Sequence, residues 1–507
     1  MSPRWPAALA VLLIAAAVVS ADPAAEALRD KVRAAVGYDA FCKLEHGVLI
    51  TGKTVSFQLP GTFSLRLHPD GRFAELSPDK TGLSAGFDGK TYWRKAFNNL
   101  PCPEELADAD QYRFRYGLLG HRWLAPGGGF TVALDPAEHR PYRPVVLVRH
   151  PAAKAGGGRV YIDPDTGLPT RFSVIDAGGV MELEVADWRD VAGAKVPGRI
   201  VINAARSGPT LTAETASPAA GPNPFAPPPG PDDTRFDPAV PPRIEARVEK
   251  GAFLVRPTVS GKPGPWLAVD TTSNYTYLTR AAADQLGLPA LGLNREDDTS
   301  TTGYRFRPAG RFAVGPAEVR ELMVLDCPPD KPAMPVSGLG VDVGGRLGND
   351  MLSRVVSELD WGAGTFAVHD PRGYRPPPGV VWEPVRFHNT HPYIEATFEG
   401  KHTGLFQVGT IGTRVEIYSR VVRELNLMAG RTAEFGKIGD AMVYRGTAAE
   451  FRAFGRGLRS VETLFDVSDL DVKMQPYCFG GISASLLGPG TLVLDYPNRR
   501  IGLAPRP

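Results

Sequence analysis

The sequence predicts a mainly β protein: an N-terminal curved antiparallel sheet with a helix, followed by two related β-rich lobes. Three observations predict this architecture. Short alternating segments separated by turn residues fill most of the region up to residue 206. A Pro-rich stretch occupies residues 207–242. The chain then runs through one strand-and-turn pattern twice, over residues 243–375 and 376–507. A chain of 507 residues has room for several domains.

The first residues have the features of an export signal. Arg4 precedes an apolar run from Ala7 to Val19, and Ser20 and Ala21 supply a small-residue cleavage site. We therefore predict a signal peptide over residues 1–21 and an exported protein, periplasmic or extracellular. The apolar run is shorter than the roughly 20 residues that a membrane span needs. Membrane association is therefore expected only if the signal stays uncleaved.

The charge and the cysteines restrict the possible partners and cross-links. The net charge is only +2, without a dense Lys/Arg block, so nucleic acid is not an expected partner. An exported chain can form disulfides. Pairing Cys42 with Cys102, and Cys327 with Cys478, would keep each bond within one half of the chain, but the spacing leaves other pairings open. The spacing matches no zinc motif, and we expect no cofactor.

The N-terminal domain is expected over residues 22–206. Leu28, Val32 and Val36 fall on one face and predict a helix over residues 23–37. Alternating strands begin at Thr54, and residues 69–71 (Pro-Asp-Gly) predict a hairpin. A second helix is expected over residues 103–119, with proline in its first turn, and strands then continue to residue 202.

Three segments of this region carry a resemblance to a known fold. They are Gly86–Trp93, Tyr161–Arg171 and Asp187–Pro197, and each is rich in turn residues. The region from about residue 23 to 210 resembles the half-barrel of the LolA/LolB lipoprotein carriers. That fold places a helix in an open sheet, where acyl chains can bind. The resemblance implies either a pocket for lipid or another apolar ligand, or a filled core used as a spacer or docking module.

The segment that follows has a different composition. Between Ser217 and Pro231, prolines are too dense for regular structure. We predict an extended, semi-rigid linker over residues 207–242.

The second half of the chain contains an internal duplication. Phe253–Lys262 aligns without a gap on Pro392–Lys401, an offset of 139 residues. A later pair of blocks, Gly345–Leu352 and Gly480–Leu487, aligns with an offset of 135 residues. The same offset aligns two strands in which Asp360 and Asp495 occupy matching positions. We expect both aspartates to have structural roles. Two copies of one unit are therefore expected.

This ordered set of motifs resembles the aspartic proteases, most closely the retropepsin-like domains of bacteria, over about residues 245–505. Those lobes carry a hydrophobic-hydrophobic-Asp-Thr-Gly turn, a flap hairpin and a Leu-Gly-x-Asp segment. Leu347–Leu352 and Leu494–Leu503 fit the later motifs. Two lobes in one chain imply a bilobal assembly with an internal pseudo-twofold axis.

The resemblance implies a site in which two aspartates share a proton, so that one serves as acid and the other as base. Asp270 and Thr271 stand at the first Asp-Thr position, with Thr272 in place of glycine. In the second copy, Gly409 replaces the aspartate and Ile411 replaces the glycine. Loss of a general acid or base costs about 10²- to 10⁴-fold in rate. Asp270 is therefore a catalytic remnant, a ligand contact or a turn cap.

Three hypotheses for function follow. The first is a pseudoprotease that binds peptide or apolar segments between its lobes. The second is an active aspartic endopeptidase that pairs two copies of Asp270 in a dimer, or recruits another acid such as Asp440. The third is a carrier of envelope lipid or lipoprotein that uses the N-terminal domain. A metal site is not expected, because His388 and His391 lie in a loop without an obvious third ligand.

Overall fold

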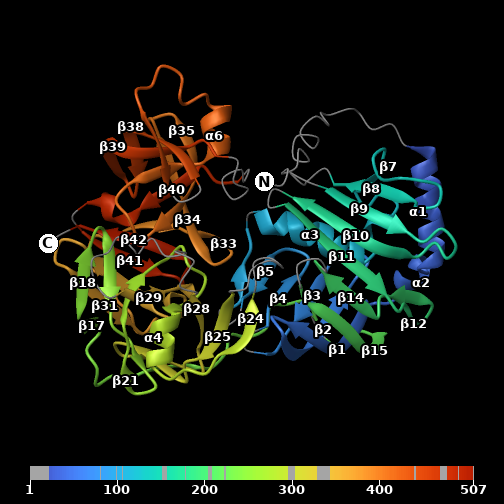
Figure 1. Ribbon diagram of the computed structural model, residues 1–507, viewed down its shortest axis with the longest axis horizontal. Helices are drawn as coiled ribbons and strands as arrows, with labels where there is room; N and C mark the ends of the chain where they lie inside the picture. Colours follow the sequence, from blue (N-terminus) through green and yellow to red (C-terminus); the bar gives the residue numbers. More distant parts are fainter. Residues whose placement is uncertain are drawn as a thin grey trace, which may run out of the picture.

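The computed structural model describes residues 22–505 except 80–81, 97, 99, 106, 151–156, 177–178, 204–207, 222–223, 295–302, 328–342, 439–440, 469–476 and 489. The chain is mainly β, as predicted. Figure 1 shows the N-terminal domain, blue to green, beside the C-terminal half, green to red.

The N-terminal domain is built on one 13-stranded antiparallel sheet, in the order β6-β5-β4-β3-β2-β1-β15-β14-β11-β10-β9-β8-β7. A separate ribbon is formed by β12 and β13. The strand bounds are β1 Val48–Ser56, β2 Leu59–Leu67, β3 Phe73–Leu76, β4 Ser84–Phe87, β5 Tyr92–Lys95, β6 Cys102–Pro103, β7 Thr131–Leu134, β8 Val145–Arg149, β9 Gly157–Ile162, β10 Pro169–Asp176, β11 Gly179–Ala186, β12 Arg189–Val191, β13 Ala194–Val196, β14 Arg199–Ile202 and β15 Thr210–Pro218.

Helices complete this domain: α1 Pro23–Ala35, α2 Tyr38–Phe41, α3 Ala107–Leu119 and the short η2 Arg122–Leu124. Asp22 caps α1 by accepting hydrogen bonds from the backbone N–H groups of Ala24 and Ala25. Helix α3 packs on the sheet, and its Phe114 and Leu118 are fully buried in the domain core. It begins four residues later than predicted, because Cys102 and Pro103 pair with β5 instead.

The expected domain boundary at residue 206 falls inside this sheet. Strand β15 lies between β1 and β14, so residues 210–218 are an interior strand and not linker. The boundary was predicted from the prolines that follow this strand. The alternation of Leu211 and Ala213 with polar residues, which is typical of a strand, was given less weight. Further on, Phe225 is fully buried against Trp93, whose indole Nε1 donates to the Phe225 carbonyl oxygen at 3.0 Å.

The C-terminal half contains two eight-stranded sheets with the same order. The first is β18-β19-β22-β29-β23-β28-β25-β24, and the second is β33-β34-β35-β40-β36-β39-β38-β37. The first has the bounds β18 Ala246–Glu249, β19 Ala252–Val255, β22 Trp266–Val269, β23 Tyr277–Thr279, β24 Leu291–Asn294, β25 Tyr304–Pro308, β28 Met323–Cys327 and β29 Val343–Leu347. The second has β33 Arg386–His388, β34 His391–Phe398, β35 His402–Gly409, β36 Val415–Ile417, β37 Glu434–Ile438, β38 Ala441–Ala453, β39 Arg456–Asp466 and β40 Gly480–Ser483.

A six-stranded sheet joins the two lobes in the order β17-β31-β30-β41-β42-β32. Its bounds are β17 Arg243–Ile244, β30 Val356–Asp360, β31 Thr365–His369, β32 Val381–Pro384, β41 Thr491–Asp495 and β42 Arg500–Ala504. At its centre, Glu358 of β30 pairs with Val493 of β41. These two residues are equivalent under the offset of 135, so the pseudo-twofold axis passes between them.

The remaining elements complete lobe 1 and lobe 2. A five-stranded sheet comprises β16 Thr234–Phe236, β20 Thr258–Val259, β21 Lys262–Pro263, β26 Arg311–Val314 and β27 Ala317–Arg320. The helices are α4 Arg280–Gln285, α5 Asn349–Leu352, α6 Ser419–Glu424 and η6 Ala484–Leu487. Strand β16 belongs to the predicted linker, yet pairs with β27 of lobe 1.

All four cysteines are free, so neither of the disulfides considered above is formed. Cys327 and Cys478 are buried, whereas Cys42 is exposed and Cys102 is partly buried. Among the helices of the described residues, none combines the length and apolar character that crossing a bilayer requires.

Candidate active site

Asp270 directly follows β22, at the point where the strand enters the inter-lobe contact. Its backbone N–H donates to the carbonyl oxygen of Leu347 in the parallel neighbour β29, at 2.9 Å. The residue is only 1% exposed. A buried carboxylate is costly unless it is paired and hydrogen-bonded, so its partners determine what it can do.

Both carboxylate oxygens of Asp270 are engaged. Oδ1 accepts from the backbone N–H and the hydroxyl of Thr272, at 2.9 and 2.6 Å. Oδ2 accepts from Nη1 of Arg346 at 2.7 Å, and the Arg346 side chain is 12% exposed. Arg346 thereby compensates the charge of Asp270 inside lobe 1. Thr272 is itself exposed and covers the carboxylate.

The two turns are joined by reciprocal threonine hydrogen bonds. The Thr271 hydroxyl donates to the Val408 carbonyl oxygen at 2.5 Å, and the Thr410 hydroxyl donates to the Val269 carbonyl oxygen at 2.6 Å. The Thr271 N–H also donates to the Thr410 hydroxyl at 3.1 Å. The first two contacts are related by the 139-residue offset, so they repeat each other across the pseudo-twofold axis.

Gly409 stands opposite Asp270, at the end of β35. A Cβ atom at this position would lie 3.3 Å from the Thr272 methyl group. The Thr272 methyl group therefore lies in tight contact with the position where any side chain replacing Gly409 would begin. Within the described residues, the hydrogen-bond partners of the Asp270 carboxylate are Thr272 and Arg346. Asp440, considered above as a replacement acid, lies outside the described residues.

The structure thus brings together Asp270, Thr271, Thr272 and Gly409, and it adds residues that sequence reasoning missed. The most important is Arg346, which the duplication places opposite Gly481. The sequence contained one signal for Arg346, because a charged residue stands where the other copy has glycine. A second is Asn349, whose side-chain amide donates to the carbonyl oxygens of Thr271 and Thr390, at 2.9 and 3.1 Å.

A polar pocket of about 190 Å³ opens beside the Asp270 turn. Thr272 and Asn274 of the turn line it, together with Tyr277, Tyr304, Arg346 and His391. Burial raises the pKa of Tyr277 above its usual range, so its hydroxyl stays protonated at neutral pH. The pocket therefore offers hydroxyl, amide and guanidinium donors, which suit a hydrogen-bonding ligand.

His391 links this pocket to the pH dependence of stability. Burial, with smaller contributions from His388 and Arg94, lowers the pKa of His391 to about 3. Because the unfolded chain takes up this proton near pH 6.5 and the folded chain does not, stability falls as the pH drops from 6.5 towards 3.

We expect His391→Gln to lose less stability between pH 7 and pH 4 than the parent protein. Urea unfolding midpoints at each pH measure this difference. His402→Gln, at a partly exposed position of β35, is the control and should follow the parent. Parallel pH profiles for the parent and His391→Gln would contradict the expectation.

The N-terminal domain contacts the two lobes through Asn98, Glu104 and Glu105. The Asn98 side chain exchanges two hydrogen bonds with the Met323 backbone of lobe 1, at 2.8 and 3.0 Å. The Glu104 side chain, fully buried, accepts from the Asn389 N–H of lobe 2 at 2.8 Å. Glu105 accepts from the Phe387 N–H at 3.0 Å. One segment of the N-terminal domain therefore ties both lobes together.

His388 and His391 do not lie in a loop as predicted: His388 ends β33 and pairs with His391, which begins β34. His388 Nδ1 lies 3.4 Å from Glu104. In the part of the chain that the structure describes, no group of three His, Cys, Asp or Glu side chains is arranged to hold a metal ion.

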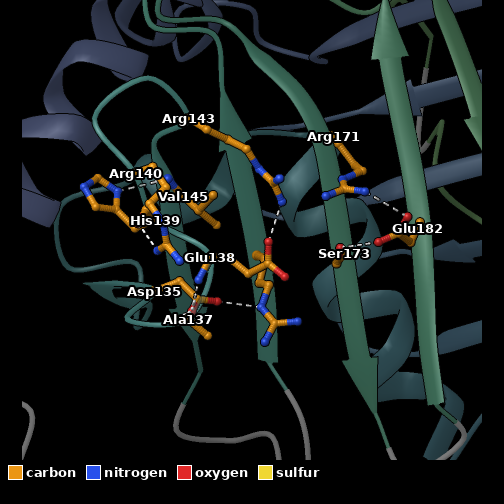
Figure 2. Close-up of polar contacts among 11 residues, drawn as sticks. Asp135, Ala137, Glu138, His139, Arg140, Arg143, Val145, Arg171, Ser173 and Glu182 are labelled. Carbon is orange, nitrogen blue, oxygen red and sulfur yellow. Dashed lines mark hydrogen bonds and ion pairs between the residues drawn. The ribbon is translucent and has the colours of Figure 1, made fainter. Parts of the chain in front are cut away.

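A second set of charged residues lies on β9, β10 and β11 and on the loop after β7, far from Asp270 in the sequence. Figure 2 shows Asp135 bonded to an arginine, which is Arg159 at 2.6 Å, and Arg171 directed at Glu182 at 3.2 Å. Ser173 also donates to Glu182 at 3.1 Å. These charges satisfy one another, although Asp135 and Ser173 are themselves buried.

Comparison with known proteins gives likenesses in structure only. The sequence matches no protein-family model and no curated protein. An aspartic proteinase from Irpex lacteus covers 52% of this chain and 96% of its own length, with 13% identity and a TM-score of 0.31. A LolA-superfamily protein from Nitrosomonas europaea covers 40% of this chain and 97% of its own, with 12% identity and a TM-score of 0.27.

A retropepsin-like aspartic protease from Rickettsia conorii covers 26% of this chain and 97% of its own, with 16% identity and a TM-score of 0.20. The structural neighbours thus include aspartic proteases and a LolA-superfamily protein. All three TM-scores lie below 0.5.

Proposed function

We propose that this chain is an exported, non-proteolytic binding protein, which holds a peptide or apolar segment in the cleft between its two lobes. One observation carries the proposal: Asp270 is paired with Arg346 at 2.7 Å, and Gly409 stands where a second aspartate would be needed. A carboxylate that is buried, neutralised and without an acidic partner lacks the acid–base division that peptide hydrolysis requires.

Exposed apolar residues favour a ligand with apolar side chains. Leu291 of β24 is 39% exposed, whereas Phe435 of β37 and Met442 of β38 are 55% and 46% exposed. The hairpins β24–β25 and β37–β38 are equivalent in the two lobes, because they end the matching eight-stranded sheets. Large exposed apolar side chains at equivalent places suit an interaction surface.

The dimeric alternative is less favoured by the geometry. Pairing two Asp270 residues would require a second lobe 1 to take the place that lobe 2 already fills. Thr410 of lobe 2 holds that place through its reciprocal bonds with lobe 1, and β41 pairs with β30 over five residues, Val356 to Asp360. The intact monomer must lose both contacts before a dimeric site can form.

Cleavage of a denatured protein substrate from pH 3 to 8 tests the absence of proteolysis. We expect the mature chain and Asp270→Asn to show the same background cleavage at every pH. A transition-state-type aspartic protease inhibitor should change neither. Cleavage that Asp270→Asn abolishes and the inhibitor blocks would overturn the proposal and require a second acid.

Binding is tested with a library of fluorescent, uncharged decapeptides, measured by anisotropy. Peptides rich in apolar residues should bind the mature chain, and Phe435→Ser combined with Met442→Ser should weaken that binding about tenfold or more. Val381→Ser, at a 46% exposed position on β32, is the matched control and should bind like the parent. Equal affinities in all three proteins would exclude the lobe 2 hairpin as a binding surface.

A further inference from the structure

A pocket of about 290 Å³ with a strongly basic lining lies in the N-terminal domain, far from Asp270. It is formed where the turns that follow β2 and β4 meet helix α3, the short η2 and the end of β8. Among the described residues, its lining includes the carboxylate of Asp70 and the guanidinium groups of Arg72, Arg113 and Arg122. These groups come from segments that are distant in the sequence.

The carboxylate of Asp70 is already balanced by its neighbours. Its Oδ2 accepts from Arg72 Nε at 2.8 Å, and its Oδ1 accepts from the Arg72 backbone N–H at 2.9 Å. Nδ1 of His68 lies 2.7 Å from the same Oδ1. Nη2 of Arg72 lies 3.3 Å from His68 Nε2, so the Nη1 group of Arg72 is left without a hydrogen-bond partner among the described residues.

Arg122 of η2 has no such balance. It is half-buried, and none of the described residues forms an ion pair or a hydrogen bond with its guanidinium. Tyr38 is within electrostatic range, but burial raises the pKa of its phenol, which therefore stays protonated. The Arg122 side chain packs across Gly71, where a Cβ atom would collide with its Nη1 and Cδ. Backbone packing, and not an acid, thus holds this cation at the pocket.

Arg113 and His150 also line the pocket, but each has contacts of its own. The guanidinium carbon of Arg113 lies 5.9 Å from the centroid of the Tyr92 ring. The His150 ring packs edge-on against Phe130, with centroids 4.8 Å apart. The unpaired charge of the pocket therefore belongs to Arg122, with the Nη1 group of Arg72 as a second unused donor.

Two stacked rings form an apolar wall beside these donors. Phe87 ends β4 and Tyr92 begins β5, and their ring centroids are 4.2 Å apart with the planes at 16°. Both residues line the pocket. A cavity of about 150 Å³ can hold benzene, so about 290 Å³ has room for an anionic group and a body the size of one ring.

We propose that this pocket binds a small phosphate monoester, with its phosphate on Arg122 and on Nη1 of Arg72, and its organic body against Phe87 and Tyr92. Guanidinium groups match phosphate oxygens in geometry and charge. The three terminal oxygens of a phosphate can accept from two guanidinium groups at once, whereas a carboxylate offers two oxygens. The pocket lies in the N-terminal domain, so the proposal does not depend on binding between the lobes.

Calorimetric titration of the mature chain with phenyl phosphate tests the proposal, with benzoate, phenol and inorganic phosphate as comparison ligands. Phenyl phosphate should bind with one molecule per chain. Benzoate should bind at least tenfold more weakly, and phenol should show no binding. Inorganic phosphate should compete with phenyl phosphate but bind more weakly, because it lacks the ring. Arg122→Gln should weaken phenyl phosphate about tenfold or more.

Arg149→Gln is the matched control, because Arg149 is a half-buried arginine at the end of β8 that lies outside the lining. It should bind phenyl phosphate like the parent. If thermal melting shows that Arg122→Gln is unfolded, Arg72→Gln provides the same comparison. No binding of phenyl phosphate at millimolar concentration, equal affinity for benzoate, or unchanged affinity in a folded variant of Arg122 or Arg72 would each overturn the proposal. Inorganic phosphate that binds as tightly as phenyl phosphate would overturn the role of the two rings.

Discussion

Arg346→Met is expected to lower the free energy of unfolding by about 3–5 kcal/mol, because it leaves Asp270 buried at 1% exposure without its charge partner. Methionine keeps most of the aliphatic volume of arginine, so the loss reports on charge and not on a cavity. Urea unfolding of the mature chain, followed by circular dichroism, measures the change.

The double variant Asp270→Asn/Arg346→Met should recover most of this loss. It carries a neutral asparagine at position 270, so no unpaired charge is left buried there. Arg372→Met supplies the surface comparison. Arg372 pairs with Asp370 at 2.7 Å while 80% exposed, so its substitution should change stability by less than about 0.5 kcal/mol. A double variant as unstable as the single one would show that Arg346 acts through packing and not through Asp270.

Arg354→Met is the second substitution with a large expected effect, about 3–5 kcal/mol. The Arg354 side chain is 1% exposed, and its guanidinium joins three segments of the chain. It bonds to the Asp233 carboxylate at 3.0 Å, to the Asn98 carbonyl oxygen at 2.5 Å and to the Asp350 carbonyl oxygen. Its loss removes the opposite charge from the Asp233 carboxylate, which within the described residues keeps only the Thr234 hydroxyl at 3.1 Å, and removes this donor from two carbonyl groups.

Calorimetry should then show a lower midpoint, because one contact between the N-terminal domain and lobe 1 is lost while the Asn98–Met323 and Glu104–Asn389 hydrogen bonds remain. Arg320→Met is the control. Arg320 is exposed and donates at 3.0 Å to the carbonyl oxygen of Asp232, so the midpoint should stay that of the parent. A single transition of unchanged midpoint in Arg354→Met would contradict a coupling role.

Much of the fold could be predicted from the sequence because its patterns are local or repeated. The four-residue spacing from Leu28 to Val36 predicted helix α1, and the Pro-Asp-Gly turn placed the β2–β3 hairpin. The duplication predicted two matching lobes, and the two eight-stranded sheets have the same order. The boundary after residue 206 was wrong, because β15 pairs with β14 just before it and with β1, which lies far away in the sequence.

The sequence by itself determined the half of the site that depends on residue identity: Asp270 and Thr271 are present, and Gly409 replaces the second aspartate. Only the tertiary structure decided how these residues are partnered. The pairing of Asp270 with Arg346 crosses 76 residues, and the contact of Thr271 with Val408 crosses 137. Such contacts depend on the parallel pairing of β22 with β29 and on the approach of the two lobes. The pairing of these strands and the approach of the lobes leave no periodic pattern in the sequence. Side chains that meet across strands must be close in space, but they need no fixed spacing along the chain.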